Sequence, residues 1–261
     1  MPCANRLAWT VGAELADDGK STPTLLVIAH PDDETMFFAP ALLALARSLE
    51  LHILCLSTGD FEGLGAVRER ELPGACARLG VPPARVRVID DPVLRDGPRA
   101  HWPPALVADL VASELLACHS SRIITFDRHG VSSHPNHTAV YNGVRELMMR
   151  RQGRLRVYEL RTLGIFRRHL GLIDVALTLI ILLASSCWRA IFSTTEARDA
   201  GVVCVSLEPW TVHLAMVEHW SQFAWFRRLY VMVSRYVWVN SLTPMEVAAD
   251  PREAMPCKKM R

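Results

Sequence analysis

Two short stretches of the chain carry the residue types that metal-dependent hydrolysis requires. His30-Pro31-Asp32-Asp33-Glu34 follows an apolar run at 24–29, and His134-Pro135-Asn136-His137 comes shortly after another at 122–126. Three carboxylates and an imidazole within five residues repel one another and resist burial, so open water, a helix end or a metal ion must compensate them. In both stretches a His-Pro pair precedes a helical pattern, and proline suits the first turn of a helix.

Taken alone, the first stretch is explained equally well as an acid-rich helix start, because the helix dipole favours negative charge at its N-terminus. The second stretch shifts this balance. His30 with Asp33, and His134 with His137, are each spaced i,i+3 and can converge on one face of a first helical turn. The two stretches can thus offer His30, Asp33 and His137 to one ion, with a position left open for water, as in catalytic zinc sites.

The remaining polar side chains of these stretches suggest a division of roles. A hydrolytic site needs a base for the metal-bound water and a donor for the oxyanion and the leaving group. Asp32 adjoins a ligand and is the expected base, with Glu34 as the alternative. His134 is the expected donor, and Asp127 is placed to orient or charge a histidine.

The elements that must position these residues are short apolar runs alternating with helical patterns. Strands are expected at 24–29, 51–56, 86–90, 122–126, 155–160 and 202–207, with helices at 35–49, 66–79, 105–119, 136–151 and from Pro209. This alternation predicts an α/β fold: a single-domain, Rossmann-like, mostly parallel sheet with helices on both faces. Such sheets bind ligands beyond the carboxyl ends of their strands, so both histidine stretches belong on the same rim.

Composition excludes several other classes of protein. Among 261 residues half are apolar and the net charge is +2, which suits a globular protein and gives no reason to expect a nucleic-acid partner. The sequence contains neither G-x-G-x-x-G nor a Walker-type loop, so no nucleotide cofactor is expected. Its seven cysteines are widely spaced, which argues against a disulfide framework and a cysteine zinc site, and favours a reducing compartment.

Four segments outside the alternating pattern complete the expected organisation. Residues 1–23 carry neither a signal peptide nor a spanning run, and are expected to be a poorly ordered lead-in to a domain at 24–242; residues 243–261 form a tail. The apolar run 170–188 is just long enough to span a bilayer. Because a span there would separate the strand at 202–207 from its sheet, we expect a hydrophobic flap against the membrane or the lipid chains. The segment 225–242 suits an interfacial helix, or a core-packing terminal helix with a solvated arginine face.

The assembled motifs resemble the PIG-L family of zinc-dependent de-N-acetylases. The matching pieces are "LLVIAHPDDETMFFAP", "STGDFEGLGAVRERELPGACARLGVP", "ITFDRHGVSSHPNHTAVY" and "WFRRLYVMVSRYVWVNSL", and the last one points to the eukaryotic, lipid-acting branch. By this resemblance the metal ligands are His30, Asp33 and His137, the general base is Asp32, its protonated partner is His134, and Arg68 with Glu71 matches an Arg-x-x-Glu element. The resemblance implies that Arg68 contacts hydroxyl or phosphate oxygens of the substrate. A surface charge paired to Glu71 or Glu62 is the alternative.

The resemblance also implies a reaction and a location. The reaction would be removal of acetyl from GlcNAc-phosphatidylinositol in GPI-anchor biosynthesis, with Zn²⁺, or Fe²⁺, Mn²⁺ or Co²⁺, at the cytoplasmic face of the endoplasmic reticulum membrane. One alternative is a deacetylase of a soluble N-acetyl sugar conjugate, against which the run at 170–188 argues. A catalytically silent membrane-associated scaffold would not need the clustered charge. A phosphatase using Asp32 as nucleophile would have little use for two histidines.

Overall fold

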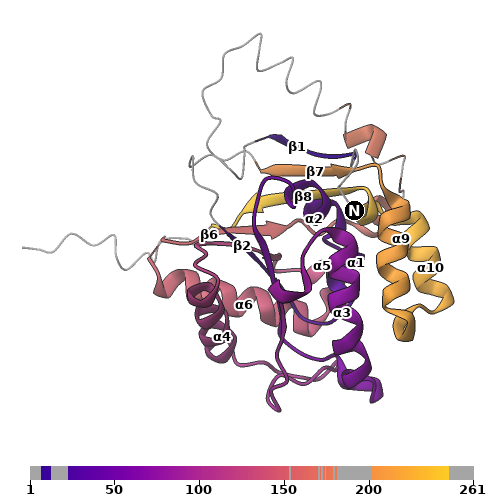
Figure 1. Ribbon diagram of the computed structural model, residues 1–261. Coiled ribbons are helices and arrows are strands. Elements are labelled where there is room, and N and C mark those ends of the chain that lie inside the picture. Colours follow the sequence, from indigo (N-terminus) through magenta and orange to yellow (C-terminus); the bar gives the residue numbers. More distant parts are fainter. Residues whose placement is uncertain are drawn as a thin grey trace, which may run out of the picture.

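The computed structural model describes residues 7–12, 23–152, 154–169, 171, 173, 175–178, 180 and 201–246. One eight-stranded sheet runs through this part of the chain, with helices on both faces (Figure 1). The strands are β1 (Ala8–Gly12), β2 (Thr24–Ile28), β3 (Leu51–Cys55), β4 (Val86–Val88), β5 (Arg122–Phe126), β6 (Arg156–Leu160), β7 (Val202–Ser206) and β8 (Val239–Pro244). Their order across the sheet is β1-β7-β8-β6-β5-β2-β3-β4.

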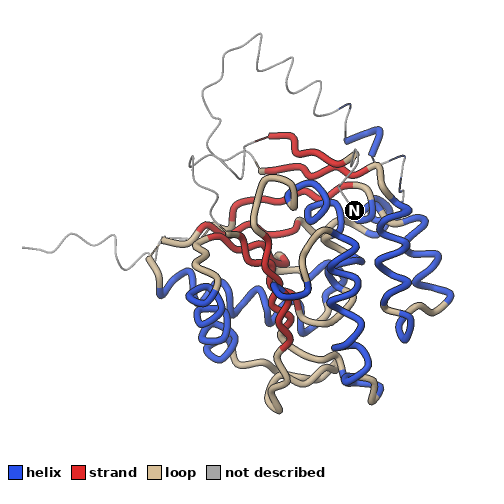
Figure 2. Tube along the Cα trace, in the orientation of Figure 1, coloured by secondary structure: helices blue, strands red, loops and turns tan. Residues whose placement is uncertain are grey.

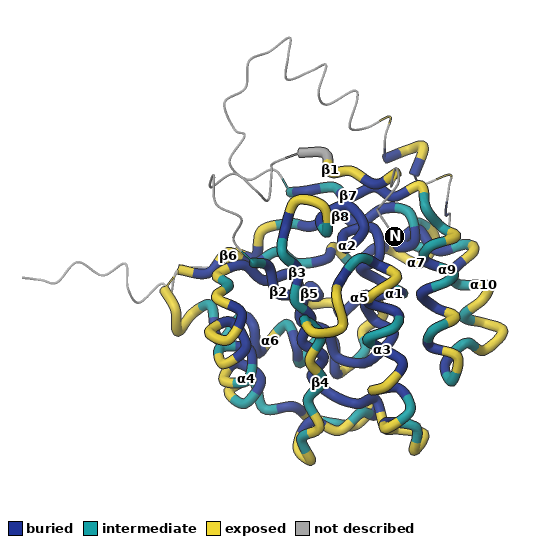
Figure 3. Tube along the Cα trace, in the orientation of Figure 1, coloured by how far each residue is buried: buried dark blue, intermediate teal, exposed yellow. Residues whose placement is uncertain are grey.

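The sheet has a parallel and an antiparallel part. Strands β6, β5, β2, β3 and β4 pair in parallel, whereas β8 pairs antiparallel with both β6 and β7, and β1 antiparallel with β7. All residues of β2 and β5 are buried, as expected for strands covered on both faces (Figure 3). The predicted α/β architecture is therefore confirmed, and β2 and β5, the two strands that precede the histidine stretches, are neighbours at its centre.

The helices cover the two faces as the topology requires (Figure 2). They are α1 (Asp33–Met36), α2 (Ala39–Leu45), α3 (Gly65–Leu79), α4 (Pro104–Ala117), the kinked α5 (Gly130–Ser133), α6 (Pro135–Arg150), α7 (Ile165–His169), α9 (Pro209–Glu218) and α10 (Trp225–Val233). Helices α4 and α6 pack against each other, and α3 packs against α9. A Cβ added at Gly143 of α6 would lie 2.3 Å from Cγ1 of Val107 in α4, so only glycine permits this close crossing.

The helix expected at 35–49 is interrupted. Helix α1 ends at Met36 and α2 begins at Ala39, because Pro40 has no N–H to donate to the carbonyl of Met36. The hydroxyl of Tyr230 donates to that carbonyl instead, at 3.3 Å. The break leaves α1 as a single short turn that carries the acidic residues of the first stretch.

Both ends of the described chain differ from expectation. Within the expected lead-in 1–23, Ala8–Gly12 form strand β1, which pairs with β7. The expected helix at 225–242 ends at Val233, and β8 then enters the sheet between β7 and β6 and runs to Pro244. Its Asn240 is buried and accepts the backbone N–H of Ala41 at 3.0 Å, which ties α2 to β8.

Most of the run 170–188 lies outside the described residues, so the structure does not address the expected flap. Within the ranges that the structure does describe, no helix combines the length and the apolar character needed to cross a bilayer.

Candidate functional site

The first histidine stretch forms a tight corner between β2 and α1. Asp32 precedes the helix with φ +112°, a left-handed conformation that side chains other than glycine seldom adopt. Such backbone conformations recur at functional sites, where surrounding contacts maintain them. Here the carbonyl of Asp32 accepts the N–H groups of Thr35 and Met36, and its own N–H donates to Oε2 of Glu34 at 3.1 Å.

Asp33 turns its carboxylate back onto the end of the strand. Its Oδ2 accepts the backbone N–H groups of Ala29 and His30, at 3.0 and 2.9 Å, and its Oδ1 lies 3.1 Å from Nε2 of His137. Burial would raise the pKa of the Asp33 carboxyl, but His137 and His30 outweigh it and hold the pKa well below its ordinary value. Asp33 is thus an ionised carboxylate that connects the two corners.

The second stretch places His134 and His137 at the start of α6. His134 caps the helix, and its Nδ1 accepts the N–H of Asn136 at 3.3 Å. The Nδ1 of His137 lies 3.0 Å from the carbonyl of Gly130, so it carries the proton as a donor to that oxygen. Nε2 of His137 is buried and faces Oδ1 of Asp33. Burial would lower the pKa of the His137 ring, but Asp33 outweighs it, and the pKa is raised.

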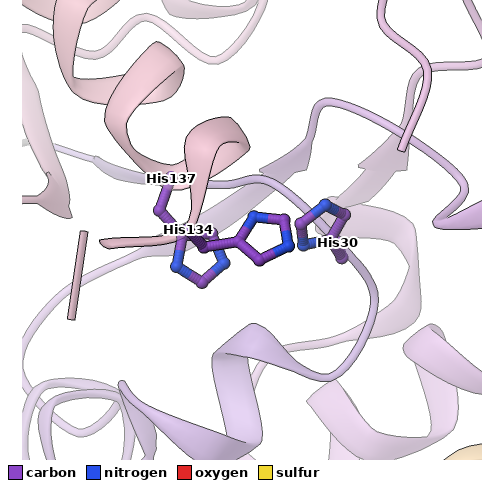
Figure 4. Close-up of side chains that lie close together, drawn as sticks. All are labelled: His30, His134 and His137. Carbon is purple, nitrogen blue, oxygen red and sulfur yellow. The ribbon is translucent and has the colours of Figure 1, made fainter. Parts of the chain in front are cut away.

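The two corners meet. Each of His30, His134 and His137 offers a ring nitrogen, and these three atoms lie within 4.8 Å of one another (Figure 4). A buried imidazole nitrogen that faces an ionised carboxylate, beside two more imidazoles, is a donor set that suits a divalent metal ion. This three-atom group includes His134, which the sequence analysis assigned to proton donation, whereas Asp33 faces His137.

Asp32, the expected base, is buried between two arginines. Its Oδ2 lies 2.9 Å from Nη2 of Arg227 and 3.5 Å from Nη2 of Arg68. Burial raises the pKa of the Asp32 carboxyl above its ordinary value, and both guanidinium groups oppose that rise.

Arg68 is part of the site rather than a surface charge. It is buried and donates to the carbonyls of Pro31 and Gly59, at 2.6 and 2.8 Å. A Cβ added at Gly59 would lie 2.6 Å from its Cζ, so this approach requires glycine. The alternative of a solvated pair with Glu71 or Glu62 is therefore wrong.

Glu34 and Glu71 both hold the segment that follows α9. Glu34 is fully buried, and its Oε1 lies 2.6 Å from Nε2 of His219. The carboxylate of Glu71 accepts from the backbone N–H and the hydroxyl of Ser221, at 2.9 and 2.7 Å. Burial would lower the pKa of His219, but Glu34 outweighs it, and the pKa is raised. Both carboxylates therefore fix the segment that contains His219 and Ser221.

Asp127 organises the loop of the second corner. Its Oδ1 accepts from the N–H groups of His129 and Gly130 and from the hydroxyl of Thr162, and its Oδ2 accepts the N–H of Thr162 at 2.6 Å. Asp127 is connected to His137 through Gly130, because it accepts the N–H of Gly130 while the carbonyl of the same residue lies 3.0 Å from Nδ1 of His137.

A cavity of about 520 Å³ adjoins the histidine cluster. Polar residues dominate its lining, among them Ser57, Thr58, Asp60, Asp90, Asp91 and Asp96. Oδ1 of Asp96 lies 3.1 Å from Nε2 of His30, so this residue connects the cavity to the cluster.

Sequence reasoning missed four polar residues of the site. Asn136, whose Nδ2 lies 3.1 Å from Nε2 of His30, belongs to the second stretch and could have been included on that ground. Asp96, His219 and Arg227 come from distant parts of the chain, and no local spacing marked them.

Comparisons with known proteins agree with this geometry. Residues 25–148 match the family model described as PIG-L, GlcNAc-PI de-N-acetylase. The chain is 38% identical over 229 residues to N-acetylglucosaminyl-phosphatidylinositol de-N-acetylase of Bos taurus, covering 86% of this chain and 84% of that protein. It is 36% identical to the probable enzyme of that name from Schizosaccharomyces pombe, covering 84% and 85%.

Solved structures support the fold at lower identity. The zinc-inhibited form of a teicoplanin deacetylase is similar with a TM-score of 0.56 at 14% identity, covering 85% of this chain and 97% of that one. The deacetylase of the A40926 pseudoaglycone gives a TM-score of 0.57 at 12% identity, covering 88% and 100%. On the identity and coverage of its curated relatives, the chain belongs to the PIG-L family.

Proposed function

We propose that the chain is a metal-dependent amidohydrolase that removes the acetyl group from GlcNAc-phosphatidylinositol in GPI-anchor biosynthesis, giving glucosaminyl-phosphatidylinositol and acetate. The observation that carries this proposal is the convergence of His30, His134 and His137 beside the buried carboxylates Asp32 and Asp33. The substrate follows from the names of the curated relatives.

His30, Asp33 and His137 would hold the ion, which we propose to be Zn²⁺. The contact between Nε2 of His137 and the ionised carboxylate of Asp33 supports this set. Fe²⁺, Mn²⁺ and Co²⁺ accept the same ligands. When bound, such a cation polarises an amide carbonyl and lowers the pKa of water to about 7.

Asp32 would take a proton from the attacking water. Its carboxylate is held by Arg68 and Arg227, so a fixed oxygen is available at the corner. Glu34 is less suited to this role because it is fully buried and paired with His219.

His134 would stabilise the carbonyl oxygen as negative charge develops and then protonate the departing amine nitrogen. Burial and the imidazoles of His137 and His30 lower its pKa to about 4, so the free ring is neutral. Because Nδ1 accepts from Asn136, the proton of that neutral ring resides on Nε2, the atom able to donate. A neutral imidazole cannot give its only ring proton to an amine, so the proton that Asp32 takes from the water would pass to His134, and the imidazolium so formed would protonate the departing amine.

The head group would occupy the polar cavity next to the cluster. Hydroxyl-rich sugars and inositols suit a lining of carboxylates and hydroxyls such as Asp90, Asp91 and Ser57. Nη1 of Arg68 lies 3.9 Å from Oδ2 of Asp96, a residue of this lining. This position supports the proposed contact of Arg68 with hydroxyl or phosphate oxygens of the substrate. Because the substrate is a lipid, we propose that the enzyme works at a membrane surface, the cytoplasmic face of the endoplasmic reticulum.

The test is acetate release from GlcNAc-phosphatidylinositol by the wild type and by Asp32→Asn, before and after chelation. We expect Asp32→Asn to keep its metal, measured by elemental analysis, and to lose turnover roughly 10²- to 10⁴-fold, the usual contribution of a general base. Chelation should abolish wild-type turnover, and added Zn²⁺ should restore it. Asp109→Asn, an exposed carboxylate of α4 paired with Arg150, is the matched control and should be fully active.

Two results would overturn this assignment. Undiminished turnover in Asp32→Asn would move the role of base to Glu34. Turnover of a soluble N-acetyl sugar conjugate with none of the lipid would replace the proposed substrate.

A further inference from the structure

Helix α10 turns its large apolar side chains outward. Trp225, Leu229 and Met232 lie at i, i+4 and i+7 on one side of the helix and are 75%, 51% and 73% exposed. Phe226 beside them is 53% exposed. A surface helix of a globular protein normally turns its apolar stripe toward the core. These four residues are here called the α10 apolar face. Helix α10 lies at the edge of the fold, with exposed stretches along its trace (Figure 3).

The inner side of the same helix makes polar contacts with the catalytic corner. Arg227 reaches Asp32, and its Nη1 also donates to the carbonyl and side-chain oxygens of Gln222, at 2.7 and 2.8 Å. Tyr230 donates to the carbonyl of Met36. The helix is thus held against the site by Arg227 and Tyr230 and packs Val231 into the core, while its larger apolar side chains remain exposed.

The chain segment that carries the α10 apolar face is basic, and of its three arginines Arg228 is the exposed one, since Arg235 is buried and Arg227 pairs with Asp32. Residues 219–245 contain no aspartate or glutamate but include three arginines. The exposed Arg228 lies at the edge of the face, with its guanidinium 4.9 Å from the centre of the Phe223 ring. Basic residues beside tryptophan and leucine are typical of helices that lie in the headgroup region of anionic bilayers.

Neighbouring elements extend the face. Ile165 and Phe166 of α7 are 65% and 83% exposed, and α7 contains no acidic residue. Gly171, just beyond α7, lies so close to α10 that an added Cβ would be 2.9 Å from the carbonyl oxygen of Val233. Beyond the other end of α10, Trp220 is exposed as well. Tryptophan is enriched at membrane–water interfaces, where its apolar ring and polar N–H are both accommodated.

We propose that the α10 apolar face, together with α7, docks on the surface of a bilayer containing anionic phospholipid. This inference rests on the proposed function, since a lipid substrate must be reached where it resides. Docking through α10 holds Asp32 next to the bilayer, because only the helix itself separates the lipid-facing residues from Arg227 and its partner. The head group can then enter the polar cavity while the acyl chains stay in the membrane.

The test is flotation of the protein with vesicles of phosphatidylcholine, with and without phosphatidylinositol. The variant Trp225→Ser/Leu229→Ser/Met232→Ser should bind vesicles at least roughly 30-fold more weakly, since three partly inserted apolar side chains are lost. The matched control, Leu116→Ser/Met149→Ser, alters exposed apolar residues of α4 and α6 and should bind as the wild type does. Arg228→Gln should reduce the preference for the anionic vesicles. Thermal melts of all variants should match the wild type, because these side chains are exposed.

Activity then separates docking from catalysis. The triple variant should lose turnover of vesicle-embedded GlcNAc-phosphatidylinositol but keep turnover of its water-soluble, deacylated head group. Equal vesicle binding by the triple variant and the wild type would overturn the docking proposal. A dimeric wild type and a monomeric triple variant that bind vesicles equally would also overturn it, because the face would then contact a second copy of the chain. A wild type that docks but deacetylates neither substrate would refute the proposed function and leave docking supported.

Discussion

The two histidine corners have similar sequences but are stabilised in different ways. At the first corner, the buried carboxylates of Glu34 and Asp32 are paired with His219 and Arg227; the first of these pairs joins residues 185 positions apart. At the second corner, Asp127 is satisfied by its own loop and by Thr162, 35 positions away. The acidic half of the site thus depends on the C-terminal segment, whereas the half with two histidines is built locally.

This difference has a functional meaning. The residues that compensate the acidic corner, His219 and Arg227, flank or belong to the elements that carry the exposed tryptophans and the α10 apolar face. Substitutions in that segment should therefore affect Asp32 more strongly than His137.

Replacing His219 by leucine should be the most damaging change. It leaves the fully buried carboxylate of Glu34 without its cationic partner, and breaking a buried pair in this way costs about 3–5 kcal/mol. For a chain of this length that corresponds to a fall in melting temperature of roughly 6–20 °C, measured by calorimetry.

The control is the same substitution in a partly exposed pair of the same type. His52 lies 3.3 Å from Glu50 near the surface, so His52→Leu should cost less than about 1 kcal/mol. Equal losses in the two variants would contradict the role assigned to the buried pair.

Replacing Arg227 by glutamine should impair catalysis more than folding. Arg227 opposes the effect of burial on Asp32, so its loss raises the pKa of that carboxyl further. Because the proposed base must be ionised, the acid limb of the pH–rate profile should move to higher pH. Turnover at neutral pH should fall by about tenfold, equivalent to about 1.4 kcal/mol, and recover in part at higher pH.

This measurement uses the water-soluble head group, so that membrane docking does not contribute. Arg70→Gln, an exposed arginine of α3 that donates to the carbonyl of Ala66, should leave the profile unchanged. A uniform loss of turnover in Arg227→Gln with an unmoved acid limb would show that Arg227 does not act through Asp32.

The contrast between the corners also explains which parts of the site could be predicted. His134 and His137 lie at the N-cap and in the first turn of α6, and His30 and Asp33 are joined by the tight turn that precedes α1. These i,i+3 spacings are local signals, as is the strand alternation that predicts both corners at one rim. The partners His219 and Arg227 depend on how α9 and α10 pack against α1 and α3, which no sequence pattern records.

The wrong predictions about the fold have a similar origin. Strands β1 and β8 enter the sheet antiparallel from the two ends of the described chain, and their pairing with β7 depends on distant residues. By contrast, the break between α1 and α2 had a local signal in Pro40, which the expectation of one continuous helix at 35–49 overlooked.

Replacing Asp127 by asparagine should have a moderate effect on the second corner. The amide keeps one oxygen as acceptor, so the contacts of the other oxygen are lost at a cost of about 1–3 kcal/mol in the free energy of unfolding. Thr162→Val removes only the hydroxyl donor and should cost less, about 1 kcal/mol. Urea denaturation of the two variants measures this order, and a larger loss in Thr162→Val would contradict it.

The smallest expected effect is a pH dependence of stability at Glu159 of β6. Burial, and then the charge of Asp127, raise its pKa from 4.5 to about 7. The folded state therefore favours the protonated carboxyl, and this contribution is complete below pH 4.5 and is lost as pH rises through 7. Because Glu159 is only partly buried, solvent screening limits it to about 1 kcal/mol. Glu159→Gln removes the titration, so urea denaturation should show the variant gaining stability relative to the wild type between pH 5 and pH 8. The same relative stability at both pH values would show that the carboxyl is already ionised at pH 5, and that the second corner tolerates a second negative charge beside Asp127.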